Sequence, residues 1–374
     1  MKVVICISSD NERSGGSFRV AEVAIRSLLR LGIEVNAIIG YGQGGRIKRL
    51  LGKNCHLVNA KSWKDLQGWI RMRRLVKQLA PDVIHFASSS NWMAACTFGL
   101  PPLRIMHQHF RPNIGPNAIK HIRYARLTMV GSNRVIAISY EAARQLINLC
   151  GIPEARVAVV HNAIDDEYLT ASRRRPTDKK RLGMAIRVVE DKGAEDAIEL
   201  LSLMPENFVL TIAGDGPALP RLKALSEEKG LACRVEWLGS IQDIDEFYSA
   251  IDYYLYMSWY EGFGLSVAEA MTCGIPVVGL LGDGEIAEPE YPLVTQENSL
   301  LLPRSSRRFC RETDMATLEK LRDAIIELDK TGDAQVMQIE AARLWITDRF
   351  SSDHYGRQLL QVYRDTLRLP RGYS

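Results

Sequence analysis

The sequence of 374 residues contains no long hydrophobic run, no internal repeat and no low-complexity tract. Its first apolar stretch, Val3 to Ile7, is five residues long and follows a single lysine. This stretch is too short for the apolar region of a signal peptide or for a membrane-spanning helix. We therefore expect a cytoplasmic protein, and a chain of this length predicts two domains of ordinary size.

Cysteine motifs are also missing. The seven cysteines are scattered along the chain, and their odd number implies no disulfide framework. No Cys-x-x-Cys pair and no Cys/His spacing typical of zinc sites occurs. We expect these cysteines to be small core residues in a reducing compartment.

The first predicted strand and helix are not joined by a Gly-x-Gly-x-x-Gly fingerprint. Residues 3–8 predict a buried strand, residues 20–29 a helix and residues 33–39 a second strand, with Gly15 and Gly16 in the first connection. A Gly-Gly turn at a helix N-terminus presents free N–H groups to an anion, although a plain tight turn explains it equally well. No acidic residue ends the second strand to bind a ribose, which disfavours a dinucleotide-dependent dehydrogenase.

Charge is distributed unevenly along the chain. Residues 1–170 carry 23 basic and 11 acidic side chains, whereas the remainder carries 25 and 33. A strongly basic first half indicates an anionic partner, such as a nucleic acid, a phosphorylated acceptor or a membrane surface.

Residues 61–80 predict an amphipathic helix with a basic face. A core helix with a solvated basic face explains this pattern, and so does a helix lying on an anionic membrane. The sequence leaves both interpretations open. The apolar residues that recur near one face are Trp63, Leu66, Trp69, Ile70, Leu75, Val76 and Leu79.

Short apolar runs alternate with helical patterns along the whole chain. Between the two halves, the polar and proline-containing segment 171–180 predicts a linker. Two successive series of strands and helices predict two Rossmann-like domains. The later strands are expected at residues 81–86, 101–110, 135–138 and 157–160, and then at 182–186, 209–213, 235–238 and 253–257.

Histidines stand at the end of one predicted strand. His107 and His109 close the segment 101–110, and the carboxyl ends of parallel strands are where α/β sheets place ligands. A His-x-His pair can bind a metal, but no carboxylate or third ligand accompanies it, so we predict no metal site. His85 lies inside a predicted strand and is expected to be structural.

The most informative stretch is 259–278. Glu261 precedes a glycine-containing loop at 262–264, and Ser266 is expected to cap the short helix that follows. A continuous helix would place Glu261 and Glu269 about 12 Å apart, whereas a loop at its start lets both carboxylates line one pocket. The pattern alone fits a helix N-terminal carboxylate and a solvated glutamate equally well.

These motifs resemble those of the retaining glycosyltransferases of family 4, which have the GT-B architecture of two Rossmann-like domains facing across a cleft. Glu261 and Glu269 match the E-x7-E signature of that family, and the resemblance covers nearly the whole chain. Ile186 and Ala163 stand where the family usually has glycine. Weaker matches occur in the expected order at Gly15-Gly16, His107, Asn162 to Asp165, Arg187 with Lys192-Gly193, and Ala213 to Pro217.

The resemblance implies the roles of the catalytic residues. The donor is a nucleotide diphosphate sugar, and Arg187 and Lys192 bind its diphosphate as negative charge develops there. Such permanent cations make a divalent metal unnecessary, and no cofactor is expected besides the co-substrate, a UDP-hexose. Glu261, near the donor sugar, bonds the sugar hydroxyls or supports the charge that develops at the ring. His107 contacts the donor sugar and the acceptor side, with His109 the less favoured candidate for that role.

The resemblance also implies a donor-binding set. Glu269 binds the ribose hydroxyls, and main-chain groups near a helix N-terminus meet phosphate or sugar oxygens. The full set is Gly15, Gly16, Gly239, Ser240, Phe263, Gly264, Leu265 and Glu269.

The GT-B resemblance assigns roles to the predicted domains. Residues 1–170 form an acceptor-binding Rossmann-like domain, and residues 171–352 form a nucleotide-sugar-binding Rossmann-like domain. Residues 353–374 supply a C-terminal helix that returns to the first domain, in agreement with the helical spacing of their apolar side chains.

We expect a retaining, metal-independent glycosyltransferase that moves a hexose from a UDP-sugar to a lipid-linked, lipopolysaccharide or exopolysaccharide acceptor. The basic first domain favours an anionic acceptor or peripheral binding to the inner face of the cell membrane. The alternatives are a soluble transferase that acts on a small molecule or a glucan, and a sugar-nucleotide-binding protein without turnover. Charge alone also permits nucleic-acid binding, but no nucleic-acid-binding module supports it.

Overall fold

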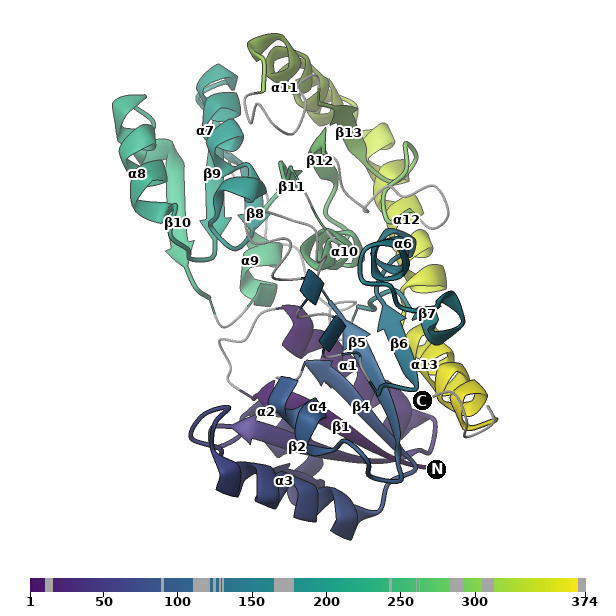
Figure 1. Cartoon of the computed structure of the whole chain (residues 1–374). Helices are drawn as coiled ribbons and strands as arrows, with labels where there is room; N and C mark the ends of the chain where they lie inside the picture. Colours follow the sequence, from purple (N-terminus) through teal and green to yellow (C-terminus); the bar gives the residue numbers. More distant parts are fainter. Residues whose placement is uncertain are drawn as a thin grey trace. The chain divides into compact units, whose positions relative to one another are not determined.

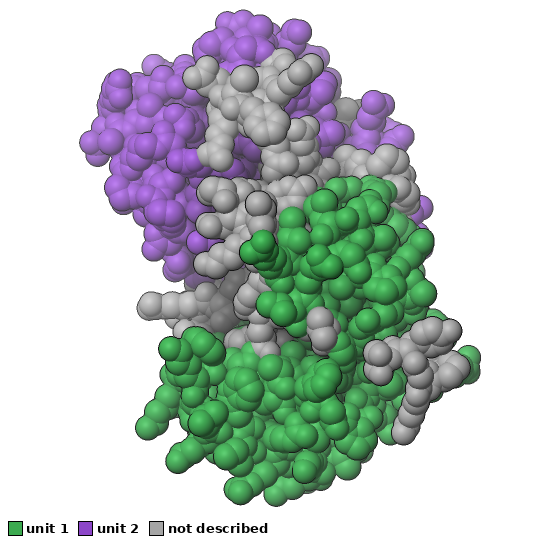
Figure 2. Space-filling model, viewed as in Figure 1, with its two compact units in different colours: residues 1–163, 350–374 green, residues 164–349 purple. Residues whose placement is uncertain are grey.

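The computed structural model describes residues 1–10, 16–88, 91–109, 122–123, 126–127, 129, 131–164, 178–241, 244–259, 261, 263–282, 292–304 and 313–368. At 16–17, 88, 91 and 333–334 it describes the backbone alone. The chain divides into two compact units, residues 1–163 with 350–374 and residues 164–349 (Figure 2). Most of the predicted linker, residues 171–177, lies outside the described residues.

The first unit is built on a parallel sheet in the order β3-β2-β1-β4-β5-β6-β7 (Figure 1). Its strands are continuous apolar runs because a parallel sheet is covered on both faces, and Val3 to Ile7 are fully buried. From β1 the chain adds strands outward to one edge, and from β4 it adds them to the other. The strands are β1 Lys2–Ser9, β2 Glu34–Tyr41, β3 Cys55–Leu57, β4 Val83–Ser88, β5 Leu103–Gln108, β6 Arg134–Ala137 and β7 Val157–Val159.

Helices of the first unit come from both ends of the chain. The C-terminal helix α13 packs on α1, and the Arg30 guanidinium donates to the Ser352 hydroxyl over 2.7 Å. Helix α1 also contacts β1, β2 and β4, so the two helices form one layer of this unit. The helices are α1 Gly16–Arg30, α2 Arg46–Leu51, η1 Gly52–Asn54, α3 Leu66–Leu79, α4 Asn91–Cys96, α6 Tyr140–Asn148, η2 Glu154–Arg156 and α13 Ser352–Arg368.

The second unit repeats this architecture. Its parallel sheet has the order β10-β9-β8-β11-β12-β13, and buried apolar residues join it to α7, α8 and α11. Helix α10 contacts β11, β12 and α12. The strands are β8 Lys180–Ala185, β9 Phe208–Ala213, β10 Val235–Gly239, β11 Tyr253–Tyr256, β12 Val277–Leu281 and β13 Leu300–Pro303.

Most helices of the second unit lie in the connections between its parallel strands, because two parallel strands need a long crossover between them. No helix among the described residues of either unit is long and apolar enough to cross a membrane. The helices are η4 Glu190–Lys192, α7 Ala194–Leu203, α8 Leu219–Glu228, η5 Ala232–Arg234, α9 Ile244–Ala250, α10 Leu265–Thr272, α11 Met315–Lys330 and α12 Gly332–Arg349.

The structure corrects the predicted packing of helix α3. Gly68, Met72 and Val76 form its buried stripe, so Val76 is the one member of the predicted apolar face that is buried. Leu66 and Ile70 are exposed instead. The helix begins at Leu66, because Asp65 caps it by accepting from the Gly68 N–H over 3.0 Å.

Candidate functional site

Strand order in the second unit reverses between β8 and β11. The chain adds β9 and β10 on one side of β8, and β12 and β13 on the far side of β11. Connections from these two strands therefore diverge, and α/β sheets bind ligands beside the carboxyl ends of such a strand pair. Arg187 and Lys192 follow β8, and Glu261 follows β11.

The segment after β8 is tied to the segment after β11. The Trp259 N–H donates to the Asp191 carbonyl over 2.9 Å. Gly193 has φ of 68°, and a Cβ there would meet the Met257 carbonyl oxygen at 1.9 Å. A larger residue would thus separate the two segments, which explains the glycine between η4 and α7.

This contact brings two predicted catalytic residues together. Lys192 Nζ lies 2.5 Å from Glu261 Oε2, and the two side chains are 20% and 24% exposed. Both charges are therefore open to a ligand. The two charges lie at the switch point, where the strand order reverses between β8 and β11. There the cation can bind a diphosphate, and the anion can accept hydrogen bonds from a neighbouring group.

Glu269 lies on α10, where it is 5% exposed. Its carboxylate accepts from the Tyr248 hydroxyl over 2.6 Å. Tyr248 lies on α9, in a segment whose role the sequence did not indicate. This tyrosine holds the Glu269 carboxylate in one orientation, as a bidentate ligand for two hydroxyls requires.

The predicted cap of helix α10 is wrong. The N-cap is Gly264, with φ of 84°, and no side chain among the described residues caps the first turn. Ser266 lies inside the helix, and its hydroxyl is 2.7 Å from the Tyr254 hydroxyl. A glycine there adopts the left-handed conformation, which leaves first-turn N–H groups for an anion.

The Tyr254 hydroxyl on β11 lies close enough to both glutamates for their charges to act on it. This hydroxyl lies within hydrogen-bond distance of Ser266 and of the Ala185 carbonyl. Burial raises the pKa of Tyr254, and the negative charges of Glu261 and Glu269 add to the rise. Both carboxylates therefore act on one point at the carboxyl end of the sheet.

Arg187 is exposed two residues beyond β8. Within the described ranges it forms no ion pair, so its guanidinium can receive a phosphate. The loop that carries it packs against Gly214, where φ is 137° and a Cβ would meet the Ile186 carbonyl oxygen at 1.7 Å. The Gly214 N–H also donates to the Gly239 carbonyl over 2.7 Å, which joins the loops after β8, β9 and β10.

The other donor-binding predictions fall in different places. Ser240 is exposed just after β10, and Leu265 opens α10, whereas Phe263 is buried. Gly16 begins α1 in the first unit. Gly15 lies outside the described residues, as do Tyr260, Gly262 and Asp165 of the matched motifs.

Three histidines of the first unit lie in a row, in which His85 and His107 are buried and His109 is half-buried. Nε2 of His85 lies 3.2 Å from Nδ1 of His107, whose ring stacks on that of His109 with 4.2 Å between centroids. Nδ1 of His85 lies 2.6 Å from the Tyr363 hydroxyl on α13. Burial lowers the pKa of His85 to about 3 and that of His109 to about 4. The pKa of His107 is lowered by burial and by both neighbouring histidines.

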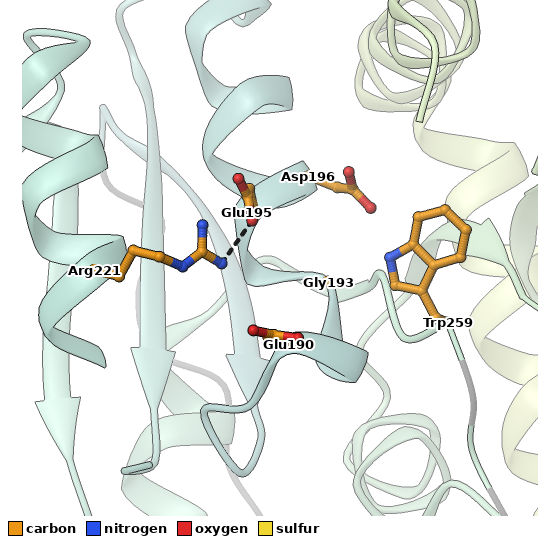
Figure 3. Close-up of a pocket in the computed structure, with 6 residues that line it drawn as sticks. All are labelled: Glu190, Gly193, Glu195, Asp196, Arg221 and Trp259. Atoms are coloured by element: carbon orange, nitrogen blue, oxygen red, sulfur yellow. Dashed lines mark hydrogen bonds and ion pairs between the residues drawn. The ribbon is translucent and has the colours of Figure 1, made fainter. Parts of the chain in front are cut away.

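A pocket of about 350 Å³ is lined by Glu190 and Gly193, which flank Lys192 in the sequence, but by none of the predicted site residues. Figure 3 shows Arg221, paired with Glu195 at 2.7 Å, on one side and Trp259 on the other. Three carboxylates make this pocket unsuited to a diphosphate. It is lined by Glu190, Gly193, Glu195, Asp196, Arg221 and Trp259.

A buried ion pair, which the sequence did not indicate, contacts the Trp259 ring. Arg304 Nη1 lies 2.6 Å from Asp196 Oδ2, and the guanidinium carbon lies 4.0 Å from the centre of the Trp259 ring. Arg304 also donates to the Met257 carbonyl. Arg304 therefore stabilises the segment that precedes Glu261. It lies 108 residues from Asp196 in the sequence.

Family models match both halves of the chain. One described as "Glycosyltransferase Family 4" matches residues 14–168, and one described as "Glycosyl transferases group 1" matches residues 165–288. A D-inositol 3-phosphate glycosyltransferase of Xylanimonas cellulosilytica is 27% identical over 228 residues, 53% of this chain and 55% of that protein. The chain thus spans about half the length of this curated relative.

Solved structures match the whole fold. The crystal structure of Anabaena Alr3699/HepE in complex with UDP and glucose has a TM-score of 0.77 at 20% identity, and the match covers 98% of this chain and 100% of that chain. WaaG, a glycosyltransferase involved in lipopolysaccharide biosynthesis, has a TM-score of 0.68 at 16% identity, with 99% and 100% covered. The predicted two-domain, Rossmann-like GT-B fold is confirmed.

Two parallel sheets of this topology give the chain the GT-B fold, and both of its halves match models of glycosyltransferases. The first half of the chain matches the family 4 model that the sequence motifs led us to expect.

Proposed function

We propose that the protein transfers a hexose from a UDP-sugar, with retention of configuration and without a metal ion. The pairing of Lys192 with Glu261 at the switch point of the second sheet carries this proposal. The ammonium group and the Arg187 guanidinium stabilise the diphosphate as it leaves, and Glu261 contacts the donor sugar. Anabaena HepE, which has this fold, was solved with UDP and glucose.

Glu269 binds the ribose in this proposal. Its buried carboxylate, oriented by Tyr248, has the acceptor oxygens that two neighbouring hydroxyls require. The uncapped first turn of α10 adds main-chain N–H donors for a phosphate. His107 and Gly16 of the first unit are assigned to the same substrates, as the family resemblance implies.

The proposed acceptor is a lipid-linked or lipopolysaccharide saccharide that carries negative charge. The basic excess of residues 1–170 supports an anionic acceptor, and WaaG supports the lipopolysaccharide class. A soluble phosphorylated polyol is the second candidate, because the curated relative is named for inositol 3-phosphate. Both acceptors share the negative charge that the basic half favours.

Helix α3 supports peripheral binding of the first unit to an anionic membrane. Leu66 and Ile70 lie one turn apart on its exposed stripe and are 73% and 50% exposed, and Arg74 and Lys77 continue that stripe. Trp63, just before the helix, is 62% exposed. Apolar and basic side chains on one face fit the boundary between acyl chains and anionic headgroups.

The donor is tested by thermal unfolding of the full chain with a panel of nucleotide sugars. UDP-sugars should raise the midpoint, since a ligand that binds only the folded state stabilises it. Turnover should persist in EDTA, and NMR of the product should show the anomeric configuration of the donor. Failure of every nucleotide sugar to bind would refute the donor assignment, and an inverted product would refute retention.

The acceptor is tested by offering two substrates to the same preparation. One is a lipid-linked saccharide in vesicles, and the other is inositol 3-phosphate in solution. Transfer to the lipid-linked saccharide alone supports the first candidate, and transfer to inositol 3-phosphate alone replaces it with the second.

A further inference from the structure

A row of polar rings runs from helix α13 to the end of strand β5 in the first unit. Tyr363 contacts His85, and His85 contacts His107, at the distances given above. Tyr363 and His85 are fully buried. His85 pairs with Ile105 across β4 and β5, so the alternation of side chains along β5 puts His107 on the same sheet face as His85.

The direction of hydrogen bonding along this row is restricted. A neutral imidazole carries one N–H and one acceptor nitrogen. Burial lowers the pKa of each of the three histidines, which are therefore neutral at physiological pH. Two orders are consistent with neutral rings: Tyr363 donates and His107 carries its hydrogen on Nε2, or Tyr363 accepts and His107 carries it on Nδ1.

The Tyr363 hydroxyl selects the first order. Burial raises its pKa, so the hydrogen is retained. Among the described residues, Nδ1 of His85 is the acceptor within reach of this hydrogen. Each order leaves one buried hydrogen unpaired, on Nε2 of His107 in the first and on the Tyr363 oxygen in the second, so the distance decides between them. The 2.6 Å between the Tyr363 oxygen and Nδ1 of His85 lies in the range of O–H donors and below that of N–H donors. His85 therefore donates from Nε2 to His107, and the hydrogen of His107 lies on Nε2.

The free nitrogens of His107 and His109 then have opposite polarity. Nε2 of His107 and Nδ1 of His109 are buried and have no hydrogen-bond partner within the described part of the chain. His109 donates from Nε2 to the Ala87 carbonyl, so its Nδ1 is an acceptor. A hydroxyl group satisfies one donor and one acceptor at once, whereas an ionised phosphate oxygen only accepts.

We infer that Tyr363 and His85 are positioning residues that hold His107 as its Nε2–H tautomer, so that His107 donates to, and His109 accepts from, a sugar hydroxyl. The identity of the ligand as a sugar rests on the proposed function. The tautomer of His107 does not rest on it, because it follows from the contacts of the free protein.

The tautomer is measured by long-range ¹H–¹⁵N NMR of the imidazole rings in the full chain. His107 should show the Nε2–H pattern, and Tyr363→Phe should shift it towards Nδ1–H. Tyr355→Phe is the matched control, because Tyr355 is buried on the same helix and its hydroxyl has no partner among the described residues. An Nδ1–H pattern in the unmodified protein, or an unchanged pattern in Tyr363→Phe, would overturn the inference.

Kinetics separate positioning from a purely structural effect. Loss of one hydrogen bond to a substrate hydroxyl should raise the KM of a sugar substrate about tenfold in Tyr363→Phe and His85→Leu, with kcat little changed. His85→Gln should restore KM, since its amide both donates and accepts. A fall in kcat with KM unchanged, or no rescue by glutamine, overturns the positioning role. If the unmodified protein turns over no nucleotide sugar, the proposed function fails and the NMR result still decides the tautomer.

Discussion

Lys192 Nζ lies 2.5 Å from Glu261 Oε2, although 69 residues separate the two in the chain. Strands β8 and β11 are neighbours in the sheet, so the segments that follow them meet at its carboxyl edge. The pair keeps a cation at the switch point while each side chain stays partly exposed. Its proposed role is to offer the cation to a diphosphate and the carboxylate to the sugar.

Removing the cation should abolish most transfer. Lys192→Ala should lower kcat/KM by roughly 100-fold or more, because one charged group that stabilises a leaving anion contributes that much. Lys229→Ala is the control, since Lys229 forms a partly exposed ion pair with Glu199 in the same unit. Steady-state transfer measures both, and equal activity of the two variants would contradict the assignment of Lys192.

Neutralising Glu261 should strengthen the binding of UDP and lower the rate of sugar transfer. Glu261→Gln keeps a hydrogen-bond acceptor for Lys192 but removes a negative charge near the proposed diphosphate. UDP should then bind several-fold more tightly because the repulsion is lost, while transfer falls because the donor sugar loses its carboxylate. Isothermal titration with UDP and a transfer assay give the two values. Unchanged UDP binding would place Glu261 away from the diphosphate, and weaker binding would mean that its charge holds Lys192 in position.

Inner strands such as β1 and β9 could be predicted from the sequence because they are apolar runs buried on both faces. The short edge strands β3 and β13, which are only partly buried, were not predicted. The pairing of Lys192 with Glu261 could not be derived from their positions, because it depends on β8 lying beside β11. The Ser266 cap failed because Gly264, in the left-handed conformation, ends the loop two residues earlier. Local sequence rules rank serine above glycine at an N-cap, and here the loop geometry decided.

Two further features of the structure could not be predicted from sequence patterns. Helical periodicity predicted the apolar residues of α3 but not which of its two apolar stripes is buried. The buried stripe is the one that contains the small Gly68. His85 meets Tyr363 across 278 residues, a contact that no spacing rule reaches. Glu261 and Glu269 were selected as candidate site residues only through a family motif, since their spacing alone also fits ordinary surface charges.

The loop that carries Arg187 should depend on Gly214. In Gly214→Ala the new Cβ would overlap the Ile186 carbonyl oxygen, so the loop must shift and donor affinity should fall. Gly230→Ala is the control, because Gly230 also has a positive φ, of 70°, but nothing lies within 4 Å of its Cβ position. The control should lose only about 1 kcal/mol of stability and keep its affinity. Donor binding to both variants by calorimetry tests this.

The buried Asp196 and Arg304 pair should control stability in a pH-dependent way. Arg304→Met leaves a buried carboxylate without its cation, which should cost about 3–5 kcal/mol near neutral pH. Burial already raises the pKa of Asp196, and Arg304 opposes that rise, so the variant raises this pKa further. A folded-state pKa above the unfolded value means that stability is lost as pH rises through that window.

The deficit of Arg304→Met should therefore shrink as the pH is lowered towards about 5, because the folded variant takes up the proton more readily than the unfolded chain. Thermal midpoints of the variant and the unmodified protein across this range give the comparison. Arg322→Met, at an exposed pair with Asp323, should show no such trend. A deficit that stays constant with pH would mean that packing of Arg304, and not the charge of Asp196, sets the loss.

Peripheral membrane binding should depend on helix α3. Leu66→Ser with Trp63→Ser should reduce sedimentation with anionic vesicles, since these side chains supply the exposed apolar surface next to Arg74 and Lys77. Leu344→Ser is a matched control, because Leu344 on α12 is 72% exposed and Leu66 is 73% exposed. Added salt should weaken binding, because basic side chains attract the anionic headgroups and ions screen that attraction. Binding that persists in high salt, or that Leu344→Ser reduces equally, would show that α3 is not the membrane contact.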